Sequence, residues 1–163
     1  MAVLVKDKTF VPDDWHAGYV PLAALSDWPD GAGVDLSSPD LTARAWERLV
    51  TLLPRLELVR IRLRHFGDLA ALDLAHAIRA TGYDGRLRAH GAVLARAYTL
   101  IRCSGFSEVE LDHAQASRQP AEHWRLDSAW QPIPLRGVWA PSPAPSTAPA
   151  RAPVVRRGDA DRG

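Results

Sequence analysis

Residues 82–111 read GYDGRLRAHGAVLARAYTLIRCSGFSEVEL, and this stretch decides the fold. The pattern predicts a strand over 86–89, a helix from about 92 to 103 and a second strand over 106–111. Gly105 comes where a glycine is expected to end the helix. A strand, a helix and a strand joined by short turns are typical of a right-handed βαβ unit with two parallel strands.

The same alternation of elements continues toward the N-terminus. A short strand is predicted over 33–36, followed by a helix that is capped by Ser38 and ended by Pro54. A longer strand is predicted over 56–63 and a further helix from about 68 to 80. Strands and helices that alternate in this way predict a mostly parallel sheet.

The strand over 56–63 shows how the sheet is covered. Val59, Ile61 and Leu63 alternate with Arg60 and Arg62, which indicates that only one face is buried by helices. The sequence therefore predicts an α/β fold of successive βα units, shaped like a barrel segment. The second face is left for a partner, or is covered by the N-terminal segment and the tryptophan-containing region 124–139.

Composition divides the chain into one domain and a tail. Hydrophobic residues make up 47% and charged residues 24% of the 163 residues, which is typical of a globular protein. The last part is rich in Pro, Ala and Ser and has few large apolar side chains. We therefore predict a single α/β domain over 1–136 and a disordered tail over 137–163.

The charge and the apolar pattern exclude several classes of protein. The net charge is +1, and without the tail the chain has 16 basic and 17 acidic residues, so no nucleic-acid-binding face is expected. The N-terminus lacks the order of a secretory signal, and no apolar run approaches the roughly 18 residues of a membrane span. The sequence therefore predicts a cytoplasmic protein without membrane contact.

Three motifs resemble a small bacterial family. They are Asp13-Asp14-Trp15, the stretch GYDGRLRAHGAVL at 82–94 and RCSGF at 102–106, and the likeness covers about residues 1–132. Members of that family are usually encoded beside assimilatory sulfite reductase and are often labelled as oxidoreductases of sulfite reduction. The resemblance implies a role in sulfur assimilation with sulfite reductase as the partner.

The chain departs from that family in two places. The family commonly has an Asp-Gly-Arg-Gly loop after its second strand, whereas this chain has HFGDLA at 65–70. The family also tends to run Arg-Cys-Gly-Phe, and here Ser104 stands between Cys103 and Gly105.

Candidate site residues lie at the predicted carboxyl ends of the strands, where sites of parallel α/β sheets form. They are His65, His90, Gly91, Asp112 and His113. The three histidines could hold a catalytic metal with an open position, although separate loop histidines are the simpler interpretation. His90-Gly91 could present backbone N–H groups to an anion such as sulfite or phosphate, or could form a tight turn that needs glycine.

Two further features have simple structural explanations. Cys103 near a helix end is expected to be a buried structural thiol, since the chain contains one cysteine and no resolving partner. Asp13 and Asp14 before Trp15 are expected to fix a turn and an aromatic anchor rather than to form a general acid–base pair.

Three functions remain open from the sequence. The first is an accessory protein that works with sulfite reductase in electron delivery or assembly and has no cofactor, because no flavin, nicotinamide or iron–sulfur fingerprint is present. The second is a small metal- or anion-binding oxidoreductase that uses the strand ends. The third is a non-catalytic scaffold that forms a homodimer through the uncovered face of the sheet.

Overall fold

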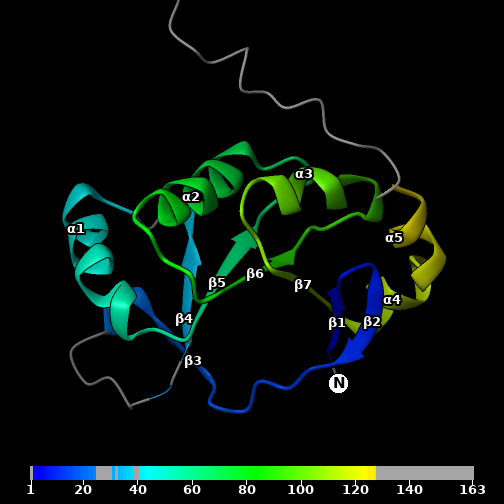
Figure 1. The fold of residues 1–163 in the computed structure, drawn as a ribbon, viewed down its shortest axis with the longest axis horizontal. Coiled ribbons are helices and arrows are strands. Elements are labelled where there is room, and N and C mark those ends of the chain that lie inside the picture. The colour runs from blue at the N-terminus through cyan, green and yellow to red at the C-terminus, as the bar shows by residue number, and fades with distance from the viewer. Residues whose placement is uncertain (1, 25–30, 32, 39–40, 128–163) are drawn as a thin grey trace, which may run out of the picture. The chain divides into compact units, whose positions relative to one another are not determined.

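The computed structural model describes residues 2–24, 31, 33–38 and 41–127 (Figure 1). These residues form a seven-stranded sheet in the order β2-β1-β7-β6-β5-β4-β3. The strands are β1 Val3–Lys6, β2 Thr9–Pro12, β3 Tyr19–Pro21, β4 Gly33–Ser37, β5 Leu58–Leu63, β6 Arg86–Gly91 and β7 Glu108–Leu111. The predicted tail at 137–163 lies outside the described residues, as do Trp130 and Trp139.

The sheet is mostly parallel, which confirms the predicted α/β class. Strands β3 to β7 pair in parallel, and β5 and β6 pair along their whole length, from Leu58 opposite Arg86 to Leu63 opposite Gly91. Strand β1 is antiparallel to both β7 and β2. Each pair of adjacent parallel strands from β4 to β7 is joined by a crossover that contains a helix, as the βαβ pattern requires.

The N-terminal strands were not predicted from the sequence. Strands β1 and β2 form a hairpin whose two turn residues, Asp7 and Lys8, have φ values of 45° and 73°. Positive φ at both positions is the geometry of the tight hairpin turn that usually contains glycine or asparagine. Asp-Lys lacks this signal, so the hairpin could not be read from local sequence.

Helices cover one face of the parallel strands. The helices are α1 Ala43–Leu52, α2 Leu69–Ala80, α3 Tyr98–Cys103, α4 His113–Arg118 and α5 Ala121–Asp127, with short 3-10 turns η1 Leu22–Ala24, η3 Leu53–Arg55 and η4 Ala95–Ala97. In Figure 1, α1, α2 and α3 lie along the same side of the parallel strands. The strand residues in the core with these helices are Val5, Val34, Leu36, Val59, Ile61, Leu63, Leu87, Ala89, Val109 and Leu111.

Helix boundaries follow local capping. Asp68 caps α2 by accepting a hydrogen bond from the Ala71 N–H, which agrees with the helix predicted over 68–80. The prediction that Ser38 caps the preceding helix is wrong. Thr42 is the cap, and its hydroxyl accepts from the Ala45 N–H, so α1 begins at Ala43.

The third predicted helix is shorter than expected. The prediction placed its start near residue 92, whereas a 3-10 turn begins at Ala95 and α3 only at Tyr98. The Gln119 side chain explains the difference. Its oxygen accepts from the Ala95 N–H at 2.7 Å, and its nitrogen donates to the Val93 carbonyl at 3.1 Å. These backbone groups are thus satisfied without a helix.

One prediction placed the region 124–139 on the second face of the sheet, and for Trp124 this prediction is wrong. Trp124 is fully buried in the helix-side core, where its ring packs edge-on against Tyr98 with centroids 5.5 Å apart. Its indole N–H donates to the Gln119 carbonyl at 3.0 Å. Helix α5 therefore closes the core beside α3.

The second face of the sheet, which we call the open face, is charged. Arg88 is fully buried there, and its Nε donates to Glu108, itself 1% exposed, at 2.6 Å. The two terminal nitrogens of Arg88 donate to both oxygens of Asp13 at 3.0 Å. The same guanidinium reaches the Tyr19 hydroxyl at 2.7 Å and Glu110 at 3.3 Å. One arginine therefore ties two strands to the N-terminal segment.

The N-terminal segment crosses the open face, as one of the two predictions for this face proposed. Asp13 accepts from the Trp15 N–H, so it fixes a turn. Arg86 donates to Asp14 at 2.6 Å and also lies over the Trp15 ring. These contacts agree with the interpretation of Asp13 and Asp14 as structural acids beside an aromatic anchor.

Burial and ion pairing shift the pKa values of this network. Burial would by itself raise the pKa of Asp13, but hydrogen bonds from Arg88 and the Trp15 N–H hold that pKa below its usual range. The hydrogen bond from Arg86 lowers the pKa of Asp14. Burial raises the pKa of Tyr19 to about 12. All three groups therefore keep one protonation state at neutral pH.

Replacing Arg88 by methionine is expected to lower the free energy of unfolding by about 3 kcal/mol, because Glu108 and Asp13 lose a buried partner. Urea denaturation measures this loss. Hydrogen exchange should also speed up at the Gly33 N–H, which donates to Gly18 next to the crossing segment. The exposed Arg118→Gln serves as the control, with a change within about 0.5 kcal/mol. Unchanged stability and exchange in Arg88→Met would contradict this role.

Acid is expected to weaken the start of α2 through Asp68. The hydrogen bond from the Arg64 guanidinium lowers the pKa of the Asp68 carboxyl well below its ordinary value. The Asp68 carboxyl therefore binds a proton more readily in the unfolded state than in the folded state. The stability that Asp68 contributes is fully present above about pH 4 and is lost as the pH falls further.

Asp68→Asn tests this effect because asparagine keeps the cap but cannot ionise. Urea unfolding near neutral pH and at about pH 3 should show a smaller loss of stability in the variant than in the parent protein. Equal losses in the two proteins would show that Asp68 does not contribute.

Candidate functional site

A cavity of about 390 Å³ lies at the carboxyl ends of β5, β6 and β7. We call it the rim pocket. Its charged lining comes from Arg60, Arg62, Arg64, Glu110 and Asp112. Parallel strands end at one edge of the sheet, and cavities of this size at that edge are common ligand sites.

The structure brings together some of the predicted site residues and leaves others apart. His90, Gly91 and Asp112 line the rim pocket. His65 and His113 are exposed and do not line it. Among the residues that the structure describes, no three His, Cys, Asp or Glu side chains are grouped so that they could hold a metal ion. The three predicted histidines are therefore not gathered in one cluster.

Arg60 is held in place by partners on three sides. It donates to both carboxylate oxygens of Glu110, at 3.0 and 2.6 Å, and lies 3.6 Å from an Asp35 oxygen. Its guanidinium carbon also lies 4.6 Å from the centre of the Tyr19 ring. These contacts neutralise Arg60, so it forms a rigid wall of the pocket.

Arg62 differs from its neighbours. It is exposed, and within residues 2–24, 31, 33–38 and 41–127 its side chain makes no hydrogen bond or ion pair. Arg64, by contrast, donates from its backbone and its guanidinium to Asp68, with Nε 2.9 Å from the carboxylate. Arg62 is thus a guanidinium at the pocket whose five donors remain available.

His90 and Asp35 form a close contact inside the sheet edge. His90 Nε2 lies 3.2 Å from Asp35 Oδ1, and the histidine side chain is only 14% exposed. Both atoms are buried, and neither has a hydrogen-bond partner in the described part of the chain, because the geometry of the contact does not align a donor with an acceptor. Nε2 of His90 is therefore enclosed beside the Asp35 carboxylate and is not exposed to the rim pocket.

Gly91 forms a tight turn. Its φ is 93°, and a Cβ atom added there would stand 2.4 Å from the Leu63 carbonyl oxygen. The following N–H groups are also used internally, since Ala92 donates to Leu63 and Val93 donates to Gly91. The structure thus supports the prediction of a tight turn at Gly91 better than the prediction that His90-Gly91 offers backbone N–H groups to an anion. Anion binding here must rest on side chains.

Asp112 and Gln115 form the opposite wall. Asp112 accepts from the Gln115 N–H at 2.7 Å, and the Gln115 side chain accepts from the Asp112 N–H, so together they cap α4. The Gln115 side chain also donates to the Gly91 carbonyl at 2.6 Å. The Asp112 carboxylate is therefore occupied in capping.

Cys103 is exposed, so the prediction of a buried structural thiol is wrong. It is the last residue of α3, where the side chain points outside the core. Its neighbour Arg102 is directed elsewhere, since it donates to the carbonyls of Phe106 and Ser107. The arginine thus anchors the turn into β7.

The rim arginines were not selected as site residues from the sequence, although a signal for them existed. Arg60 and Arg62 stand on the polar side of an alternating strand, which placed both on the open face. The local pattern could not show that Glu110, fifty positions away, pairs with Arg60, or that Arg62 has no side-chain partner among the residues that the structure describes. Pairing depends on strand order, which the alternation does not encode.

Among the described residues, none of the helices has the length and apolar character needed to cross a membrane.

Comparison with known proteins places the chain in a family. No curated protein and no solved structure matches the chain. The model of a family described as bacterial protein of unknown function, DUF934, matches residues 39–132, which is more than half of the chain. The chain therefore belongs to the DUF934 family.

Proposed function

We propose that this protein is an accessory of assimilatory sulfite reduction that binds a small oxyanion in the rim pocket. The observation that carries the proposal is the guanidinium of Arg62, which has no partner among the described residues and lies at the carboxyl edge of a parallel sheet. The role in sulfite reduction is supported by the resemblance of the 13–15, 82–94 and 102–106 motifs. In this role the protein acts with sulfite reductase in electron delivery or assembly.

The pocket has the chemistry that a small oxyanion requires. Arg62 can donate two parallel hydrogen bonds to two oxygens of sulfite, sulfate or phosphate. Arg60 and Arg64 keep their acids neutralised, so Glu110 and Asp68 repel an incoming anion less than free carboxylates would.

The other two functions are less well supported by the geometry. A metal-dependent oxidoreductase would need clustered ligands, and the described residues offer no such group. A homodimer through the open face would need that face to be uncovered, whereas the N-terminal segment already crosses it and Arg88 and Glu108 are buried there. Obligate dimer interfaces are usually more apolar than this face.

Arg62→Gln is expected to weaken sulfite binding about tenfold, because it removes the charge while keeping a side chain of similar length. Isothermal titration of the full chain with sulfite, sulfate and phosphate measures the effect. Binding by the parent protein should also weaken with added sodium chloride, since the pocket is open to solvent.

Arg118→Gln is the matched control, since it removes one exposed arginine that does not line the pocket. It should bind sulfite as the parent does. Failure of all three anions to bind, or equal affinity in Arg62→Gln, would rule out the rim pocket as the anion site.

The link to sulfite reduction is tested separately. Tagged full-length protein should retain sulfite reductase from extract of its own cells, and deletion of its gene should slow growth on sulfite as the sulfur source. An unrelated tagged protein of similar charge is the control. Absence of the reductase together with normal growth after deletion would end this assignment while leaving the binding result intact.

A further inference from the structure

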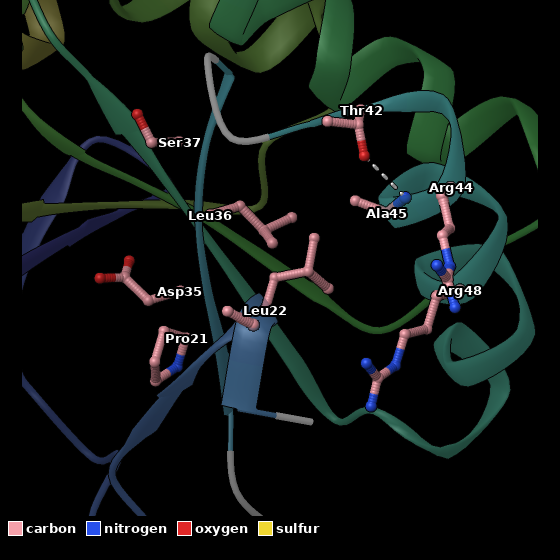
Figure 2. A pocket seen from close by; sticks show the side chains of 10 residues that line it. Pro21, Leu22, Asp35, Leu36, Ser37, Thr42, Arg44, Ala45 and Arg48 are labelled. Carbon is pink, nitrogen blue, oxygen red and sulfur yellow. Dashed lines mark hydrogen bonds between the residues drawn. The ribbon is translucent and has the colours of Figure 1, made fainter. Parts of the chain in front are cut away.

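A second cavity, of about 340 Å³, lies between the ends of β3 and β4 and the first turns of α1 (Figure 2). We call it the α1 cavity. It shares no lining residue with the rim pocket. Neither the family nor the proposed function assigns it a role.

The floor of the α1 cavity is apolar. Leu22 and Leu36 contribute to it, and they are 7% and 3% exposed. In Figure 2 their side chains point from η1 and β4 toward α1, and Pro21 lies beside them. Ala45 faces this floor from the helix. Such a surface fits a hydrocarbon or aromatic group better than it fits an inorganic ion.

Two arginines stand on the helix side of the cavity. Arg44 and Arg48 are one turn apart on α1, both are exposed, and Figure 2 shows both side chains running along the same side of the helix. In the part of the chain that the structure describes, neither side chain makes a hydrogen bond or an ion pair. Two like charges at this spacing destabilise a helix slightly, so stability of α1 does not explain the pair.

We propose that the α1 cavity binds an organic anion that has an apolar body, such as a carboxylate, sulfate ester or phosphate ester. The anionic group lies between the guanidinium groups of Arg44 and Arg48, and the apolar body packs on Leu22 and Leu36. Asp35 takes no part in this binding, because its carboxylate lies on the opposite side of β4 from Leu36, next to Arg60 and His90 (Figure 2).

The test is a titration of the full chain with n-octyl sulfate, in the presence of enough sulfite to fill the rim pocket. One molecule should bind per chain. Octanol lacks the charge and inorganic sulfate lacks the apolar body, so each should bind at least tenfold more weakly at this site. Far-UV circular dichroism confirms that the protein stays folded throughout the titration.

The double variant Arg44→Gln/Arg48→Gln should weaken octyl sulfate binding tenfold or more, while Arg118→Gln should leave it unchanged. Both changes lie at exposed helix positions, so folding should be retained. Equal binding in the double variant, several molecules bound per chain, or displacement of octyl sulfate by sulfite would each overturn the proposal. The last outcome would place the compound in the rim pocket instead.

Discussion

The charged face of the sheet depends on Arg88, a guanidinium that is completely buried and surrounded by acceptors. Taking such a group out of water costs several kcal/mol, and the cost is recovered only when its donors are all paired. Asp13 and Glu108 supply most of this pairing, which requires β6, β7 and the N-terminal segment to be in register. Glu110 contacts both Arg88 and Arg60, so the same network extends along the sheet toward its carboxyl edge.

This network explains why the edge of the sheet differs from its centre. In the centre of the sheet Arg60 and Arg88 each have a carboxylate within hydrogen-bond distance, because an unpaired charge there would be costly. At the edge water reaches the side chains, so it costs little that the Arg62 side chain has no partner within the part of the chain that the structure describes. The exposed guanidinium of Arg62 lines a cavity whose other arginines, Arg60 and Arg64, are paired with carboxylates.

Sequence patterns predicted features that depend on neighbouring residues and missed contacts between residues that are far apart in the sequence. The alternation in 56–63 showed a sheet with one helix-covered face, because side-chain direction in a strand follows directly from sequence position. The β1–β2 hairpin was missed because Asp7 and Lys8 do not have a turn signature. For the site, the predicted positions included His90 and Gly91, which do line the rim pocket. Its arginines were recognised only after long-range pairing showed which of them is neutralised.

Asp35 is the residue that connects the two cavities. It lines the α1 cavity, and its carboxylate also contacts Arg60 and His90, which line the rim pocket. A carboxylate at this position repels any anion that approaches the region between the cavities, since it is only partly neutralised by Arg60 at 3.6 Å. We therefore expect the two proposed anion sites, one at Arg62 and one at the α1 arginines, to act separately, because the two cavities share no lining residue and this carboxylate disfavours an anion near both.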